Sequence, residues 1–236
     1  MNNPEFFLST QFWWIASLII PIVVGTYAHI RVTGAYRKYA QVPVSGGMTG
    51  REAAAAVMEH AGVRNVQIVE IPGEMTDHYD PIHKKLALSS ANYHGSTIAA
   101  VGVAAHEAGH AIQDKAHYLP MNFRMGMVPA VNFAGSILPF VIMGGLFFGA
   151  AGGWLLDIGI GCYLAITAFH LITLPVEFDA SNRAKKQLVA LGITRGNETR
   201  GINETLDAAG FTYVAGFLAS LVNLIYLVML RRDRDE

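Results

Sequence analysis

Two histidines, His106 and His110, lie four residues apart in the short motif His-Glu-Ala-Gly-His. Residues at this spacing lie on one face of an α-helix, one turn from each other, so both imidazoles can bind one Zn²⁺ ion. Glu107 follows the first histidine, where its carboxylate can take a proton from a zinc-bound water whose pKa the metal lowers to about 7. The motif predicts a zinc site with Glu107 as the catalytic base. The alternative is a pair of helix histidines satisfied by ordinary hydrogen bonds.

A catalytic zinc ion has three protein ligands and one open position for water. The third ligand must therefore come from elsewhere in the chain, on the same side of the membrane as the motif. Two predicted spans separate the motif from Glu177 and Asp179, so the chain returns to that side just before these two residues. We expect Glu177 to be the third ligand, with Asp179 as the alternative.

Two residues that follow the motif compete for the third position. Asp114 comes four residues after His110, but three ligands along one straight helix would not converge on a tetrahedral ion. His117 would need the metzincin pattern, which places a glycine and a histidine where this chain has Gln113 and Ala116. Neither residue is therefore the expected ligand.

Three histidines outside the motif are also candidates for the site. His78 and His83 lie in a turn-like segment, 77–83, and could line a cleft, although loop histidines are more often exposed to solvent. His170 lies two turns before Glu177, near the end of a predicted span, where ionisable residues are costly and often functional. It could orient Glu177 or a substrate carbonyl, or it could simply reach the membrane interface.

The composition indicates an integral membrane protein. The 236 residues are 52% hydrophobic and 15% charged, and the mean hydropathy is +0.34, whereas soluble domains carry about 25% charged residues. The net charge of −1 provides no basic field for nucleic acid, so we expect no nucleic-acid partner. Cys162 is the single cysteine, which excludes an intramolecular disulfide and leaves histidine and carboxylate as metal ligands.

The hydrophobic pattern predicts a mainly α membrane protein with about four transmembrane helices and a small α+β, zincin-like cytoplasmic domain. The predicted segments are transmembrane helix 1 (6–30), the polar catalytic domain with the zinc-motif helix (31–127), a hairpin of transmembrane helices 2 and 3 (128–175), a helical segment with the third ligand (176–210) and transmembrane helix 4 (211–230).

Local signals predict the elements of the polar domain. Thr49 and Glu52 are typical of a capping box at the start of a helix over 50–61. Alternating apolar and polar residues predict strands over 66–71 and 85–90.

The zinc motif and the region after the hairpin are predicted to be helical. The motif helix, over 97–113, is expected to follow Ser96 as its cap. We expect Pro175 to end the third span, an amphipathic helix over 177–190 to follow, and a short helix over 203–209 to precede the last span.

Lysine and arginine residues set the expected orientation, because they are enriched in cytoplasmic loops. The polar domain and the segment after the third span carry them, whereas the N-terminus and the hairpin tip carry none. Both polar segments should therefore face the cytoplasm. Arginines at the chain's end oppose this assignment, since four spans would put them outside. The ten residues that favour it are Arg31, Arg37, Lys38, Lys115, Arg124, Arg183, Lys185, Lys186, Arg195 and Arg200, and the three that oppose it are Arg231, Arg232 and Arg234.

Four longer segments add specificity to the zinc motif: Asp77–Pro81, Val103–Gln113, Leu174–Ser181 and Phe211–Ala215. With them, nearly the whole chain resembles the YugP-type neutral zinc metallopeptidases. The resemblance implies a multi-pass protein of the bacterial plasma membrane with one Zn²⁺ ion and a protein or peptide substrate. It leaves the substrate and the oligomeric state open.

The chain is more distantly similar to the HtpX-type and CAAX prenyl membrane proteases. These proteins pair a helix-borne motif with a later glutamate ligand, and the matching position is Glu177. In that wider group an aspartate four residues further on supports a motif histidine. Ser181 occupies that position here, and Asp179 is the nearest carboxylate that could take its role.

The expected activity is hydrolysis of peptide bonds in membrane-associated proteins or peptides by a zinc-activated water, with Glu107 as base and later as proton donor. His170, Tyr213 and Arg183 are candidates for a second donor to the oxyanion. The strand over 85–90 could offer an unpaired edge to an extended peptide. Two alternatives are a membrane metal-ion transporter that uses the motif histidines as a transit site, and a catalytically silent membrane scaffold.

Overall fold

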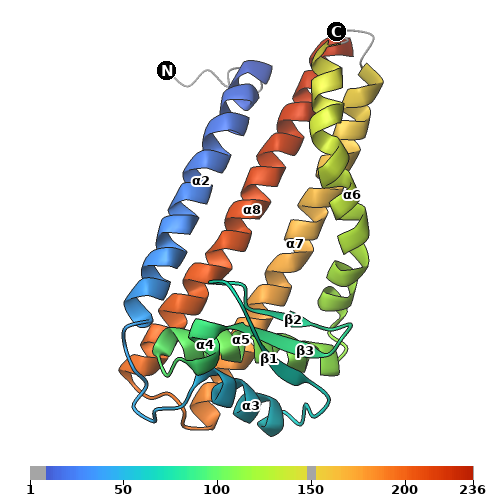
Figure 1. Ribbon diagram of the computed structural model, residues 1–236. Coiled ribbons are helices and arrows are strands. Elements are labelled where there is room, and N and C mark those ends of the chain that lie inside the picture. Colours follow the sequence, from blue (N-terminus) through green and yellow to red (C-terminus); the bar gives the residue numbers. More distant parts are fainter. Residues whose placement is uncertain (1–8, 148–152, 236) are drawn as a thin grey trace. The chain divides into compact units, whose positions relative to one another are not determined.

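The computed structural model describes residues 9–147 and 153–235, which are mainly helical with one small sheet (Figure 1). Predicted residues that fall outside this part are 6–8 of the first span and 148–152 at the hairpin turn. The elements are α2 (Thr10–Tyr39), α3 (Gly50–His60), β1 (Gln67–Ile71), β2 (His78–Asp80), β3 (Lys85–Ser89), α4 (Ser90–His94), α5 (Ile98–Lys115), α6 (Leu119–Phe147), α7 (Gly153–Ala190) and α8 (Asn197–Asp235).

Helices α2, α6, α7 and α8 are long and apolar enough to cross a membrane. The remaining elements are three short strands and three shorter helices within the described residues. The prediction of a mainly α fold, with about four candidate spans and a small α+β part, is confirmed.

The chain divides into two compact units. The first contains residues 1–28, 123–174 and 212–236, and the second contains residues 29–122 and 175–211. The second unit therefore holds the sheet, α3, α4, α5 and one end of each of α2, α6, α7 and α8. The zinc motif and Glu177 both belong to it.

The three strands form one sheet in the order β1-β3-β2, with β1 parallel and β2 antiparallel to β3. Every residue of β3 after Lys85 is buried, because neighbours cover the strand. The expectation that this strand offers an unpaired edge is wrong, since β1 and β2 occupy both of its sides. The segment 77–83, expected to be a turn, contributes β2.

The predicted capping box at the start of α3 is confirmed. The Thr49 hydroxyl accepts a hydrogen bond from the Glu52 backbone N–H, and the Glu52 carboxylate accepts one of 2.8 Å from the Thr49 backbone N–H. The Thr49 hydroxyl also donates to this carboxylate, and the two hydrogen bonds that the carboxylate accepts from Thr49 lower the pKa of Glu52. Gly50 follows the cap, where a Cβ would overlap backbone atoms of Asn92 and Ala100, so only glycine permits this approach.

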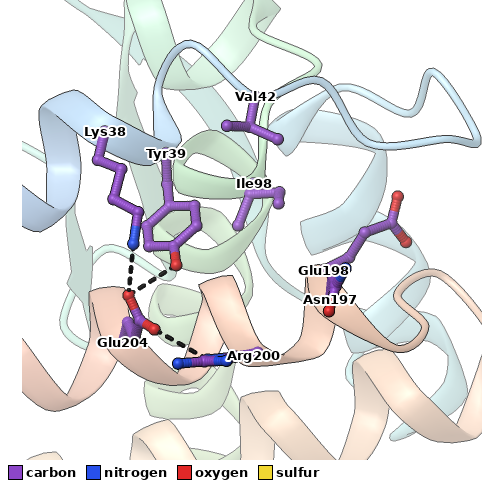
Figure 2. A pocket seen from close by; sticks show the side chains of 8 residues that line it. All are labelled: Lys38, Tyr39, Val42, Ile98, Asn197, Glu198, Arg200 and Glu204. Atoms are coloured by element: carbon purple, nitrogen blue, oxygen red, sulfur yellow. Dashed lines mark hydrogen bonds and ion pairs between the residues drawn. The ribbon is translucent and has the colours of Figure 1, made fainter.

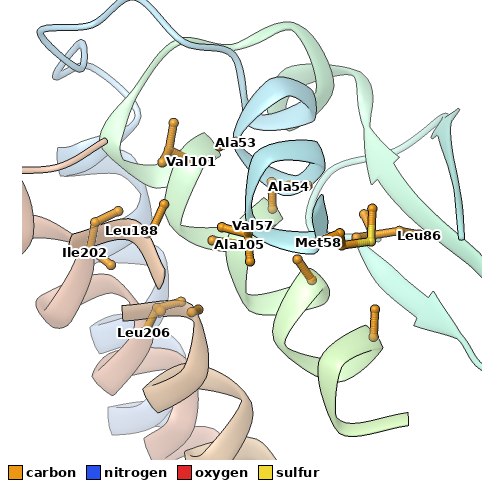
Figure 3. Packing of buried hydrophobic residues seen from close by; sticks show 14 of the residues in the cluster. Ala53, Ala54, Val57, Met58, Leu86, Val101, Ala105, Leu188, Ile202 and Leu206 are labelled. Carbon is orange, nitrogen blue, oxygen red and sulfur yellow. The ribbon is translucent and has the colours of Figure 1, made fainter. Parts of the chain in front are cut away.

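Helix α5 lies at the centre of the second unit's core, and Figure 3 shows the side chains packed around it. It begins after Thr97, whose hydroxyl accepts from the Ala100 N–H, and not after Ser96 as expected. Its buried face is mostly alanine and glycine, and such small residues let neighbouring helices approach closely. The larger side chains that fill the core come from its neighbours, including Val57 of α3 and Ile202 of α8.

Helix α7 continues through Pro175, so the expectation of a separate helix after this proline is wrong, although the boundary between the two units falls just before it. An interior proline costs a helix about 3 kcal/mol or more. Four residues beyond it, spaced one turn apart, are fully buried and keep the helix packed: Val176, Ala180, Ala184 and Leu188. The predicted amphipathic helix over 177–190 is therefore the end of α7.

Helices α6 and α8 are also longer than expected. The predicted short helix over 203–209 and the last span form one helix, α8, in which Gly210 lies against the ring of Phe178. A Cβ at this position would lie 3.1 Å from the Phe178 ring, and glycine leaves that space free. Helix α6 begins at Leu119, before the expected start of the second span at residue 128.

Candidate metal centre

Three side chains from two helices converge in the second unit. Glu177 Oε2 of α7 lies 3.3 Å from His106 Nε2 and 3.5 Å from His110 Nε2 of α5. One ligand atom from each of the three residues lies within 4.8 Å of the other two. These three residues could hold a metal ion, and they are the ones that the sequence predicts as ligands.

The donor set and spacing fit a zinc ion. Two imidazole nitrogens and one carboxylate oxygen are a known ligand set of catalytic zinc sites. Ligand atoms about 2.0–2.1 Å from a tetrahedral ion lie about 3.4 Å apart, close to the two contacts of Glu177. The side chain of His106 is 15% exposed, against 9% for His110 and 2% for Glu177. Solvent therefore reaches the cluster at His106.

Gly109 allows the two helices to meet at this point. A Cβ at this position would overlap the backbone carbonyl of Ala180 in α7, so α5 can pack this closely only with glycine here. Ala180 is one turn after Glu177, and Gly109 immediately precedes His110. The close approach thus brings the carboxylate of α7 to the imidazoles of α5.

Ser181 contacts the first motif histidine. Its Oγ lies 3.1 Å from His106 Nδ1, so the hydroxyl can accept a hydrogen bond from the Nδ1–H and leave Nε2 free for a metal. Ser181 occupies the position where the wider protease group has an aspartate. Ser181 contacts His106 itself, whereas Asp179 contacts Gln113 and Arg183.

Gln113 contacts the second motif histidine. Its Oε1 lies 3.0 Å from His110 Nδ1, and its Nε2 donates to Val176 O at 2.7 Å and to Asp179 Oδ2 at 2.8 Å. In the sequence Gln113 stands out only as a departure from the metzincin pattern, and this contact with His110 is not predicted. The available signal was its position three residues after His110, on the same helix face.

Glu107 is buried beside the two histidines, with 8% of its surface exposed. Burial lowers the pKa of His110, but the hydrogen bond and charge of Glu177, with a further contribution from the charge of Glu107, raise it above its ordinary value. The charge of Glu107 therefore acts on His110, and the role of Glu107 as a base stays a prediction.

The competing ligands make other contacts. Asp114 accepts hydrogen bonds from the Tyr79 hydroxyl and the Lys84 ammonium, which attach β2 and the start of β3 to α5. Burial and the hydrogen bond to Asp114 raise the pKa of Tyr79. Nδ1 of His78 contacts Thr76 O, and that of His83 contacts Asp80. The cluster that could hold a metal contains none of these residues.

The remaining predicted site residues fall in two places. Arg183 Nε donates to Asp179 Oδ2 at 2.5 Å, and its guanidinium lies 5.8 Å from the centre of the Tyr118 ring. His170 and Tyr213 belong to the first unit, where the His170 ring packs against α8 at Gly216. The proposed roles of these residues as oxyanion donors stay predictions.

A hollow of about 430 Å³ opens elsewhere on the second unit, over the end of α2 and the start of α8 (Figure 2). Glu204 lines it and pairs with Lys38, the Tyr39 hydroxyl and Arg200. None of its eight lining residues belongs to the predicted zinc site.

Comparison with known proteins agrees with these observations. A family model described as "putative neutral zinc metallopeptidase" matches residues 14–232. The chain is 41% identical over 219 residues to the "putative membrane protease YugP" of Bacillus subtilis. The aligned residues are 92% of this chain and 96% of the relative. No solved structure matches the chain significantly. The chain belongs to the family described as "putative neutral zinc metallopeptidase".

Proposed function

We propose that the protein is an integral-membrane zinc endopeptidase whose single Zn²⁺ ion is held by His106, His110 and Glu177. The observation that carries this proposal is the convergence of one ligand atom from each residue within 4.8 Å. Family membership supports it, because the family is described by both the metal and the reaction.

The chain's own residues would divide the chemistry between them. When bound, the ion supplies Lewis acidity, which acidifies a water molecule and polarises a peptide carbonyl. Glu107 accepts the proton that the attacking water loses, and it returns this proton to the leaving amine as the carbon–nitrogen bond breaks. His106 is the most exposed ligand, so substrate would approach the site from its side.

We further propose that the protein crosses the bacterial plasma membrane several times and exposes the second unit to the cytoplasm. The four long apolar helices and the name of the Bacillus relative support the membrane location. The basic residues near the spans, predominantly on the second unit, support the orientation. Substrates would then be membrane-associated proteins or peptides.

The orientation can be tested with introduced cysteines in a Cys162→Ser background. Met75 is an exposed loop residue of the second unit, and Trp154 follows the predicted hairpin turn. In intact spheroplasts, an impermeant maleimide should label Trp154→Cys but not Met75→Cys, and it should label both after permeabilisation. Labelling of Met75→Cys alone in intact spheroplasts would show the opposite orientation, with the second unit outside the cytoplasm.

The activity is tested with Glu107→Gln. Purified wild type and variant, loaded with zinc, are incubated with a mixed peptide library, and new termini are read by mass spectrometry. The variant should bind zinc as wild type does and lose at least about 100-fold in cleavage rate, the lower range for a general base. Glu59→Gln, on the exposed side of α3, is the matched control and should cleave normally.

Three results would overturn the proposal. Cleavage by Glu107→Gln at the wild-type rate would remove the proposed base. Metal flux through proteoliposomes without any proteolysis would favour a transporter. A wild-type protein that binds no zinc would favour a silent scaffold.

A further inference from the structure

Gln113 is fully buried and joins the zinc-motif helix to α7 on both sides of Glu177. Its amide oxygen contacts Nδ1 of His110, and its amide nitrogen contacts Val176 O and Asp179 Oδ2. One side chain thus connects a motif histidine to the residue before Glu177 and to the residue two positions after it. This arrangement fits a residue that positions His110.

The partners of Gln113 determine the direction of each hydrogen bond. A backbone carbonyl and a carboxylate can only accept, so the two hydrogens of the amide nitrogen must point to Val176 O and Asp179 Oδ2. The amide oxygen is then the group that faces His110, and Nδ1 of His110 must carry the proton. Nε2 of His110 keeps its lone pair and lies on the side of Glu177, 3.5 Å from Oε2.

Asp179 is separated from the His110 imidazole by the side chain of Gln113. Its Oδ2 accepts from both Gln113 and Arg183, so its negative charge is balanced by the guanidinium. Ser181, which is uncharged like Gln113, contacts Nδ1 of the other motif histidine, His106. Nδ1 of each histidine therefore has a neutral partner, and the carboxylate of Asp179 acts on His110 through the Gln113 amide.

We propose that Gln113 is a positioning residue, which selects the Nδ1-protonated form of His110. Through its hydrogen bond to Asp179, which pairs with Arg183, it also fixes the orientation of the His110 ring at the metal site. The proposal rests on the proposed function, because it assigns His110 as a zinc ligand. Partners of metal-bound histidines typically contribute about 10- to 100-fold to metal affinity. Gln113 should contribute within this range.

The first test is the zinc dissociation constant, measured by competition with a chromophoric chelator on the purified full-length protein in detergent. Gln113→Leu keeps a similar volume and removes all three hydrogen bonds, so the constant should rise by about 10- to 100-fold. Gln187→Leu is the matched control, because Gln187 Oε1 contacts Nδ1 of His60 at 2.5 Å, outside the metal cluster. That variant should bind zinc as wild type does.

A rescue experiment separates positioning from general loss of structure. Gln113→Glu alone turns a carboxylate oxygen toward two acceptors, the Val176 carbonyl and the carboxylate of Asp179. Adding Asp179→Asn supplies an amide that can donate to the new glutamate, whose other oxygen accepts from His110. The double variant should bind zinc at least about tenfold more tightly than Gln113→Glu alone, a coupling that independent structural losses would not produce.

The outcomes distinguish this inference from the proposed function. If wild type binds zinc and Gln113→Leu binds it equally well, the positioning role is overturned and the zinc site stands. Strictly additive effects of Gln113→Glu and Asp179→Asn would also overturn it. If wild type binds no zinc, the proposed function itself fails.

Discussion

Gly109 of α5 lies so close to Ala180 of α7 that a methyl group at residue 109 would overlap the Ala180 carbonyl. The residue after Gly109 is a motif histidine, and Glu177 lies one turn before Ala180. The backbone contact therefore sets the distance between the carboxylate and the two imidazoles. Glycine within the zinc motif has a packing role as well as a place in the sequence pattern.

Substituting Gly109→Ala should separate the two helices and weaken the metal site. The overlap involves backbone atoms, which cannot rotate away, so we expect a loss of about 1–3 kcal/mol in stability and at least about tenfold in zinc affinity. Melting temperature and zinc affinity report the two effects. Gly102→Ala, two turns earlier on α5, is the control, because its Cβ would meet only the flexible end of Ile202 at 3.0 Å. Equal zinc affinities in the two variants would contradict the role of the Gly109 contact.

Ser181→Ala should weaken zinc binding by about tenfold, because His106 Nδ1 loses its partner from α7. Ser181→Asp should bind zinc as tightly as wild type or more tightly, since a carboxylate accepts a stronger hydrogen bond from the Nδ1–H than a hydroxyl does. Titration with zinc measures both variants. Ser220→Ala, which removes a hydroxyl that donates to Phe217 O in α8, is the control. The assignment fails if Ser181→Ala binds zinc as tightly as this control.

The capping box of α3 should make stability depend on pH in acid. The hydrogen bonds from Thr49 lower the pKa of Glu52 in the folded protein below its ordinary value of 4.5. The ionised carboxylate therefore stabilises the fold above pH 4.5, and this contribution is lost as the pH falls through the folded-state pKa.

Glu52→Gln keeps a hydrogen-bonding group at the third position of α3 but does not titrate. The melting temperature of wild type should exceed that of Glu52→Gln at pH 7, and the difference should shrink steadily as the pH falls from 5 to 3. Thr49→Ala should lower stability by about 1 kcal/mol at pH 7, as expected for loss of an N-cap. A difference between wild type and Glu52→Gln that stays constant with pH would contradict the lowered pKa.

Local sequence signals predicted a large part of this structure. Some signals lie within single helices, where neighbouring residues determine the local structure. They are the four-residue spacing of the two histidines, the Thr49–Glu52 pair and the long apolar runs. Their predictions agree with the observed motif helix, the capping box and the four candidate spans. The placement of Glu177 beside the two histidines was also anticipated, because counting spans returns the chain to the motif's side.

Contacts between distant elements were harder to predict. The central position of β3 depends on which strands pair, and its alternating pattern does not reveal that both sides are covered. Helix α7 continues through Pro175 because a buried stripe beyond it outweighs the local cost of proline. The contacts of Gln113 depend on the register of α5 against α7, which no short motif specifies.

The zinc dissociation constant of Glu177→Gln tests the central claim most directly, since Glu177 is the ligand proposed from α7. We expect the affinity to fall by at least about 100-fold relative to wild type and to the Glu59→Gln control, with a melting temperature equal to that of chelator-treated wild type. Zinc binding by Glu177→Gln at the wild-type affinity would contradict the account.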